Sequence, residues 1–180
     1  MSDLSQLTAG VWNVDTSHSR VGFVARHLMI AKVRGQFRDF SGVITIAPNP
    51  LESEVEAIVD LSSVDTGDAS RDEHLRSADF FGVDQHPRMT FTSTGVKEDG
   101  DDHVLFGDLT INGLTRQVEF DLTFEGVGPD PWGGTRAAFT AEAEVSRKDW
   151  GLEWNAALET GGVVLGDKVK IELEIEAVKA

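Results

Sequence analysis

Apolar and polar residues alternate with a period of two through most of this chain, and this alternation limits the possible folds more than any other feature. The clearest example is the segment 117–125, QVEFDLTFE, in which every second residue is apolar. Successive side chains of a β-strand point to opposite faces, so such a segment can bury one face and leave the other in water. The pattern therefore predicts half-buried β-strands.

Segments with the same alternation recur along the sequence. Residues 1–10 lack it and are expected to form a loose lead-in, residues 28–33 a turn or an edge segment, residues 126–134 a long turn and residues 148–166 an irregular segment. The predicted strands are 15–27, a strand that ends at Ile46, 53–61, 88–96, 103–111, 117–125, 136–145 and 168–178.

One segment departs from the strand pattern. Residues 66–81, TGDASRDEHLRSADFF, are rich in helix formers and carry Thr and Asp near their start, where helices favour such residues. Pro87 ends this region, because the residue before a proline avoids the helical conformation. We expect a short helical insertion of one or two turns around 66–81.

About eight strands with one wet face each must close into a barrel or pair with a second sheet. A barrel of about eight strands either fills its interior with side chains or encloses one small ligand. The length of 180 residues suits a single domain spanning 1–180. The predicted inward faces contain small residues, which fit both a packed barrel and an open apolar lumen: Ala25, Gly42, Ala57, Gly107, Ala137, Ala141 and Ala143.

Composition excludes several classes of function. The formal charge of -15 makes binding to nucleic acid or to an anionic membrane surface unexpected. The chain has no cysteine, which excludes disulfides, thiol nucleophiles and zinc–thiolate sites. No run approaches the roughly 18 apolar residues of a membrane span, and the first residues show no secretory signal, so we expect a cytoplasmic protein without an integral membrane segment.

The sign of the charge reverses locally in one segment. From Thr16 to Arg38 there is no acidic residue, although the whole chain has 31 Asp and Glu against 16 Lys and Arg. We interpret this segment either as a rim that attracts anions or as a basic patch that complements the acidic surface of another subunit. Its basic residues are Arg20, Arg26, Lys32, Arg34 and Arg38.

Short motifs follow one another in a fixed order over almost the whole chain. They are WNVD at 12–15 with His18-Ser19, Val21, Phe23 and His27-Leu28, GQF at 35–37, RDEHLRS at 71–77, DFF at 79–81, Pro87, FTST at 91–94, GDLTI at 107–111 with Gly113, and SRKDWG at 146–151. In this order and spacing they resemble the YceI family, the lipocalin-like polyisoprenoid-binding proteins of bacteria. Many members of that family look exported, whereas this chain begins without a signal.

The resemblance implies an all-β, lipocalin-like fold. It implies an extended eight-stranded antiparallel β-barrel with a helical piece near its mouth and an elongated apolar pore. That pore would bind and carry or sequester one polyisoprenoid or a similar long-chain lipid, in a homodimer, without catalysis and without a cofactor. The alternatives are an enzyme that acts on such a lipid in the same lumen, and a packed protein-interaction module.

The residues expected to line the lumen are the large apolar side chains of the predicted inward faces. Each could equally be plain core, and the resemblance favours the lumen for the set as a whole. They are Val21, Phe23, Phe37, Phe40, Ile44, Met89, Phe91, Leu109, Ile111, Phe120, Leu122, Phe139 and Leu173.

Three polar residues complete the predicted ligand site. His27 ends the inward face of the first strand and is either a hydrogen-bonded core residue or a contact to a lipid head group. Helix spacing could bring Arg71 and His74 together, either on a solvated face paired with Asp72 and Glu73 or on a rim that binds a phosphate.

Catalytic and metal sites are not expected. Asp15, Ser17 and His18 have the residue types of a hydrolase triad, but neighbouring residues in a strand point to opposite faces, and no nucleophile elbow is present. The five histidines are too scattered for a metal motif.

Overall fold

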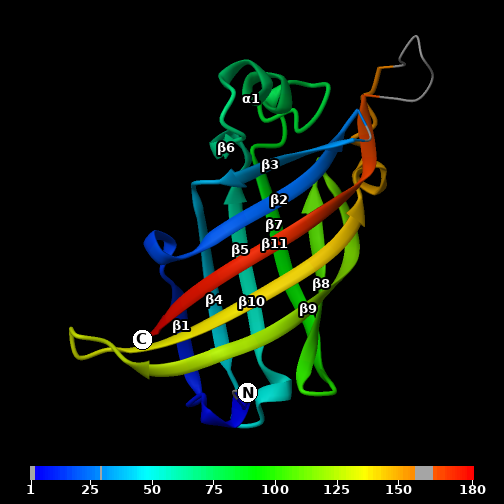
Figure 1. The fold of residues 1–180 in the computed structure, drawn as a ribbon. Coiled ribbons are helices and arrows are strands. Elements are labelled where there is room, and N and C mark those ends of the chain that lie inside the picture. The colour runs from blue at the N-terminus through cyan, green and yellow to red at the C-terminus, as the bar shows by residue number, and fades with distance from the viewer. Residues whose placement is uncertain (1–2, 29, 157–163) are drawn as a thin grey trace.

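The protein is a β-barrel with a short helix over its upper end (Figure 1). The computed structural model describes residues 3–28, 30–156 and 164–180. The strands are β1 Gly10–Val14, β2 Arg20–His27, β3 Ala31–Phe37, β4 Phe40–Ile46, β5 Glu54–Asp60, β6 Val64–Asp65, β7 Arg88–Asp99, β8 Asp102–Ile111, β9 Leu114–Pro129, β10 Thr135–Ser146 and β11 Leu165–Lys179. The helix α1 spans Ala69–Arg76, and 3-10 turns occupy Leu4–Gln6, Thr16–His18, Pro50–Glu52, Leu61–Ser63 and Arg147–Trp150.

Eight antiparallel strands close the barrel in the order β1-β4-β5-β7-β8-β9-β10-β11 and back to β1. The closing contact pairs the short β1 with the last residues of β11, in the register Trp12↔Lys179 and Val14↔Ala177. On its other side β1 pairs with β4, in the register Gly10↔Ile46. This closure confirms the predicted all-β barrel with a short helical insertion.

The upper half of the barrel wall is built differently, because β11 leaves β1 and pairs with β2 there. In the β11–β2 pair, Leu173 is opposite Val21 and Ile171 is opposite Phe23. The strand β2 pairs on its other side with β3, where Phe23 is opposite Gly35. The strand β3 pairs in turn with β6 through Gln36 and Phe37, and its first residues have no strand partner on that side within the described parts of the chain. The segment 28–33, predicted as a turn or an edge, indeed contains the tip of this hairpin and the start of β3.

The predicted strand 15–27 is wrong at its start. Residues 16–18 form a 3-10 turn that separates β1 from β2. The carboxylate of Asp15 accepts hydrogen bonds from the Ser17 N–H at 3.0 Å and from the Ser17 hydroxyl at 2.7 Å. Such a side-chain turn interrupts a strand without altering the apolar alternation, so the hydrophobic pattern did not reveal it.

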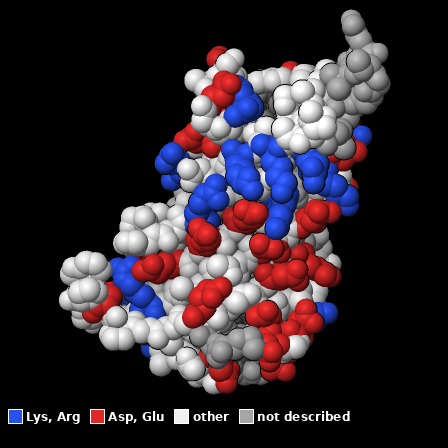
Figure 2. Space-filling model, viewed as in Figure 1, with Lys and Arg blue, Asp and Glu red and all other residues white. Residues whose placement is uncertain are grey.

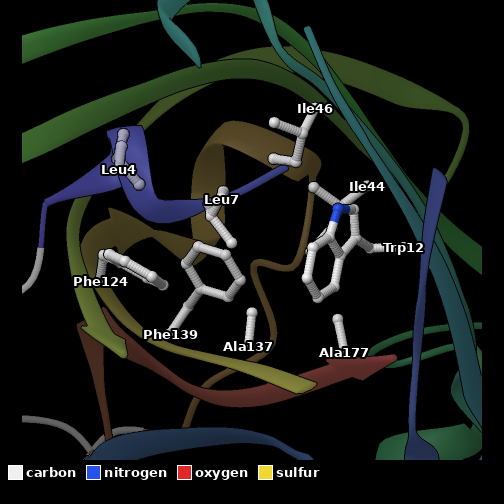
Figure 3. Close-up of a cluster of buried hydrophobic side chains, with 9 residues drawn as sticks. All are labelled: Leu4, Leu7, Trp12, Ile44, Ile46, Phe124, Ala137, Phe139 and Ala177. Carbon is white, nitrogen blue, oxygen red and sulfur yellow. The ribbon is translucent and has the colours of Figure 1, made fainter. Parts of the chain in front are cut away.

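The N-terminal segment is not a loose lead-in, which corrects the prediction for residues 1–10. Asp3 caps a 3-10 turn by accepting from the Ser5 N–H at 2.9 Å, and the turn directs Leu4 and Leu7 into the lower end of the barrel. Both leucines are buried in one apolar cluster that closes this end (Figure 3). Its other members are Trp12, Ile44, Ile46, Phe124, Ala137, Phe139 and Ala177.

The helix α1 lies at the opposite, upper end of the barrel (Figure 1). Asp68 caps it by accepting from the Arg71 N–H at 3.1 Å. The buried carboxylate of Asp72 ties the helix to the chain before it, because it accepts from the N–H and the hydroxyl of Thr66 at 2.9 and 2.5 Å. The helix is shorter than the predicted region 66–81, which continues as turns after Ser77.

Two other boundaries differ from the prediction. The strand β9 runs on to Pro129, so the long turn expected over 126–134 shrinks to the tip of the β9–β10 hairpin. The segment 148–166 begins with a 3-10 turn at Arg147–Trp150, and residues 157–163 lie outside the described residues. Among the described residues, no helix has the length and apolar character needed to cross a membrane.

Candidate functional site

The interior of the barrel contains two apolar chambers. The lower chamber has a volume of about 180 Å³ and the upper chamber about 310 Å³. Val21, Met89 and Ile171 line both, so the chambers abut along the barrel axis. The upper volume falls in the range of ~300–1,000 Å³ that is usual for small-molecule sites. The barrel therefore has room for a guest and is not filled by its own side chains.

The lower chamber is walled almost entirely by apolar residues. Its other lining residues include Ser41, Ser53, Thr90 and Thr140, and none of its described lining residues is ionisable. The Thr140 hydroxyl itself is on the outer face, where it donates to Glu125 at 2.8 Å. Of the residues predicted to face the lumen, those that line it are Val21, Phe40, Ile44, Met89, Phe91, Leu109, Phe120, Leu122, Phe139 and Leu173.

Two glycines keep this interior open. A Cβ placed on Gly107 would lie 2.2 Å from Cζ of Phe91, and a Cβ on Gly35 would lie 2.3 Å from Cζ of Phe23. The tip of each phenylalanine ring thus occupies the space that a side chain on the neighbouring glycine would fill. The missing side chain lets the ring occupy the wall of the barrel, and the axis beside it remains free.

The upper chamber is larger and includes polar side chains. Among the predicted site residues, it is lined by Val21, Phe23, His27, Phe37, Arg71, His74, Met89 and Ile111. The exposed side chains of His27 and Arg71 are part of this lining, so the chamber reaches the surface at the upper end. We call this opening the mouth.

Arg71 and His74 flank the mouth but bond to different partners. The Arg71 guanidinium donates from Nε to the Thr66 hydroxyl at 2.7 Å and from Nη2 to the Thr66 carbonyl at 2.8 Å. His74 Nε2 lies 2.9 Å from a carboxylate oxygen of Asp79. The His74 ring also packs edge-on against Trp154, with ring centroids 4.6 Å apart. The helix therefore presents one guanidinium and one imidazole to the mouth without joining them.

Arg147 shapes the wall of the upper chamber, a role that the residue pattern did not predict. Its side chain is 5 % exposed and donates to the carbonyls of Gly166 at 2.9 Å, Trp154 at 2.9 Å and Leu152 at 2.5 Å. Burial lowers the pKa of Arg147, and the nearby charge of Asp167 acts in the opposite direction. The guanidinium thus holds the irregular segment after β10 against the start of β11.

Other lining residues were also missed by sequence reasoning. Leu4 and Leu7 line the lower chamber, and Trp150, Leu152 and Trp154 line the upper one. The two tryptophans in an otherwise irregular segment were the available signal. Trp150 is 2 % exposed, and its indole N–H donates to the Leu109 carbonyl at 2.9 Å.

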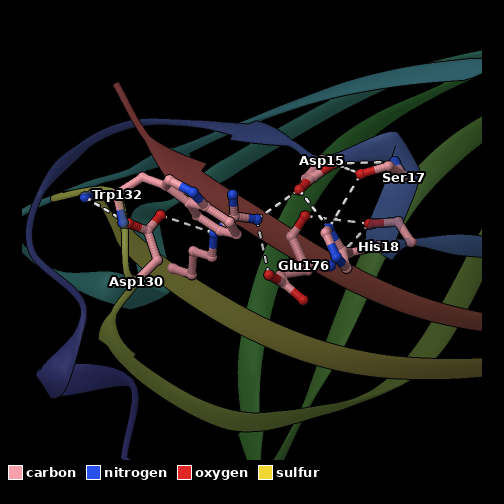
Figure 4. Close-up of polar contacts among 9 residues, drawn as sticks. Asp15, Ser17, His18, Asp130, Trp132 and Glu176 are labelled. Atoms are coloured by element: carbon pink, nitrogen blue, oxygen red, sulfur yellow. Dashed lines mark hydrogen bonds and ion pairs between the residues drawn. The ribbon is translucent and has the colours of Figure 1, made fainter.

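A polar cluster outside the lumen resembles a metal site in composition only (Figure 4). One ligand atom each of Asp15, His18 and Glu176 lies within 4.8 Å of the others. However, Arg136 Nη1 lies 2.6 Å from Asp15 and 2.9 Å from Glu176, so a fixed cation already occupies the space between the two carboxylates. These bonds, with those from Ser17 and His18, hold the pKa of Asp15 well below its usual value.

The same cluster does not have the geometry of a hydrolase triad. The Ser17 hydroxyl and the Asp15 carboxylate both reach the same ring nitrogen of His18, Nδ1, at 3.1 and 2.9 Å. A triad needs the nucleophile on one ring nitrogen and the carboxylate on the other. We interpret the cluster as a brace between the start of the barrel, β10 and β11.

Comparison with known proteins identifies similar chains. A family model described as YceI-like domain matches residues 12–177. "Protein YceI" of Escherichia coli O17:K52:H18 is 45% identical over 137 residues, which cover 76% of this chain and 72% of that protein.

Solved structures share the fold. The Campylobacter jejuni YCEI protein matches with a TM-score of 0.74 and 29% identity, over 86% of this chain and 90% of that chain. Burkholderia cenocepacia BcnA matches with a TM-score of 0.79 at 22% identity, over 91% and 98%. A polyisoprenoid binding domain from Saccharophagus degradans matches with a TM-score of 0.71 at 18% identity, over 96% and 100%. The last two likenesses concern the fold alone.

Proposed function

Because this chain belongs to the family of YceI-like domains, we propose that it binds a polyisoprenoid or a similar long-chain lipid in the barrel lumen and carries or sequesters it. The single observation that carries the proposal is the pair of abutting apolar chambers along the barrel axis. The fold likeness to a domain described as polyisoprenoid-binding supports the same choice of ligand.

The energetics of such a complex depend on the apolar tail. Burial of a methylene group is worth about 0.8 kcal/mol, so each five-carbon unit contributes up to about 4 kcal/mol before ordering costs. No charged contact is needed in the lower chamber for tight binding. Because one methylene changes the binding free energy by only ~1 kcal/mol, we expect a broad tolerance for tail length.

The polar groups at the mouth are proposed to meet the lipid head group. Arg71 makes no ion pair within the described ranges, and its guanidinium can pair with a phosphate through two parallel hydrogen bonds. His27 is exposed at the end of β2 and lines the same chamber. His74 is held by Asp79 and the ring of Trp154, which orients it at the mouth.

We propose a carrier and not an enzyme. Acid–base or nucleophilic catalysis on the tail would need polar groups that converge inside the lumen, and the described lining of the lower chamber offers only hydroxyls. The homodimer and the cytoplasmic location suggested at the sequence level also remain proposals. Light scattering on a sizing column tests the dimer, and fractionation of the native host tests the location.

The direct test is the lipid content of the protein. Freshly purified, unheated protein is extracted into organic solvent and analysed by mass spectrometry, and uptake of a fluorescent prenyl ligand by the emptied protein is titrated. We expect a long-chain lipid in the extract and saturable uptake. If no lipid is recovered and no prenyl ligand enters, the proposal is wrong.

A matched pair of variants links uptake to the lumen. Ala141 lines the lower chamber, whereas its near neighbour Ala138 points to the other face of β10. Ala141→Phe fills the chamber and should abolish uptake, while Ala138→Phe should bind as the parent does. Equal uptake by both variants would place the ligand outside the barrel.

A further inference from the structure

Four basic side chains cluster on the outer wall of the barrel near its mouth. Val21, Phe23, Ala25 and His27 on β2 line the upper chamber, so the residues between them face outward. The outward positions include Arg20 and Arg26 on β2 and, in the paired strand β3, Lys32 and Arg34. We call these four residues the basic face. Figure 2 shows a band of positive charge across this part of the barrel, above a surface rich in Asp and Glu.

The basic face is compensated by the protein only at Arg20 among the described strand pairs, because Arg20 has the acidic Glu174 directly opposite it in the β2–β11 pair. None of its four residues makes an ion pair within the part of the chain that the structure describes, whereas Lys170 on the adjacent β11 lies 3.3 Å from Glu142. Arg26 is directly opposite Lys32 in the β2–β3 pair. Like charges in that position destabilise a sheet. The fold therefore tolerates a repulsion that an external anion would relieve.

An apolar tip projects beside the basic face. The turn between β2 and β3 exposes Ile30 by 85% and Leu28 by 38%. Leu28 has a φ of 56°, a left-handed conformation that glycine or asparagine would adopt at lower cost. The turn borders the mouth, because His27 pairs with Leu165 and both line the upper chamber.

We propose that the basic face and the apolar tip dock the barrel on an anionic lipid surface, with the mouth of the upper chamber next to the bilayer. The cations would lie at the level of the lipid phosphates, and Leu28 and Ile30 would enter the boundary between head groups and acyl chains. This combination of basic and apolar side chains is that of proteins which bind at a membrane interface without spanning it.

The net charge of -15 does not oppose this docking at physiological salt. Charges separated by more than a Debye length, about 8 Å, are largely screened. The barrel surface nearest the bilayer would be the basic face. Most of the acidic surface lies lower on the barrel wall, and a smaller number of Asp and Glu side chains lie above the basic band (Figure 2). A prediction from total charge alone, which disfavoured anionic membranes, therefore overlooks the uneven distribution of that charge.

The inference goes beyond the proposed function and can be tested without a luminal ligand. A docked mouth would let a lipid tail pass between bilayer and lumen without crossing water. The competing occupant is the acidic surface of a second copy of this chain. Docking on a bilayer explains the apolar tip, which an acidic partner surface would leave unmatched.

The experiment is sedimentation with vesicles at an ionic strength of about 0.1 M. One set of vesicles contains phosphatidylglycerol in phosphatidylcholine, and the other contains phosphatidylcholine alone. Each basic residue near an anionic surface contributes about fivefold to partitioning, so Arg26→Gln with Lys32→Gln should weaken binding about 30-fold. Ile30→Ser should weaken it about tenfold. The control, Lys97→Gln with Arg116→Gln, changes the net charge equally on β7 and β9 and should bind as the parent does.

The outcomes separate the possibilities. We expect binding to the anionic vesicles only, loss of binding at 0.5 M salt, and a melting temperature of the Arg26/Lys32 variant equal to or above that of the parent. Equal behaviour of that variant and the control would overturn the proposal. The proposal would also be overturned if the parent does not bind vesicles but self-associates in a salt-sensitive way, and if the Arg26/Lys32 variant abolishes that self-association. The Ala141→Phe variant should lose prenyl uptake but keep its vesicle binding, because docking on the bilayer does not depend on the lumen.

Discussion

The substitution Gly107→Ala tests whether the lumen stays open because a phenylalanine ring lies over a glycine. The new methyl group would lie 2.2 and 2.4 Å from Cζ and Cε2 of Phe91, and 2.9 Å from the Thr92 carbonyl oxygen. Real Cβ atoms do not approach that closely, and the carbonyl is held in the β7–β8 pair, so the ring has to move. We expect it to swing off the wall into the lower chamber.

The expected loss of stability follows from three contributions. Overpacking costs about 1–3 kcal/mol, and the edge-on contact of Phe91 with Phe120, at 5.4 Å between centroids, adds about 0.5–1.5 kcal/mol when it is lost. Replacing glycine by alanine stabilises the folded state by about 0.4–1 kcal/mol, because it reduces the conformational entropy of the unfolded chain. The net destabilisation is about 2 kcal/mol, which for a chain of this size lowers the melting temperature by about 4–8 °C.

The assay combines thermal unfolding by circular dichroism with uptake of a fluorescent prenyl ligand. Gly128→Ala is the matched control, because a Cβ at Gly128 meets no atom within 4 Å. The second substitution Phe91→Ala in the Gly107→Ala background should restore uptake by removing the displaced ring. Melting and ligand uptake of Gly107→Ala equal to those of Gly128→Ala would contradict this role of Gly107.

Three further outcomes are expected from other parts of the molecule. Leu7→Ala should lower the free energy of unfolding by about 2–5 kcal/mol in urea titrations, because the residue closes the lower end of the barrel; a change below 1 kcal/mol would show that the N-terminal turn does not seal it. Trp150→Phe should cost about 0.5–1.5 kcal/mol in the same titration by removing the hydrogen bond from the indole to the Leu109 carbonyl, and an unchanged midpoint would contradict that role. The pKa of Asp15 is lowered in the folded state, first by Arg136, so its contribution is present at neutral pH and is lost as the pH falls below about 4. Asp15→Asn should therefore lower the melting temperature at pH 7 and weaken its decline towards acid pH, and parallel melting curves from pH 7 to 3 would argue against the brace.

Much of the barrel could be predicted from the alternation of residues. The segment 117–125 lies inside β9, and the helix α1 falls within the predicted region 66–81. The alternation works here because one face of each strand is wet and the other is apolar. His27, Arg71 and His74 line the same chamber, and their contact with a lipid head group stays a prediction.

The errors have a common physical cause. The turn at Asp15 and the buried turn at Leu4–Gln6 are set by side-chain hydrogen bonds to the backbone, which leave no periodic signal. Arg147 binds the main-chain carbonyl of Trp154 and that of Gly166, which is 19 residues further along the chain. The Gly166 partner is not identifiable until the chain is folded.

By itself, the sequence determined most of the strands, the face that their residues take and the resemblance to a lipid-binding family, because these depend on local pattern and on motif order. Only the tertiary structure decided whether the lumen is open. The same large and small residues could fill a barrel or line one, and the difference lies in where rings such as Phe91 and Phe23 come to rest. The structure also gathered the cations of β2 and β3 beside the mouth, because strand pairing sets their register across the sheet.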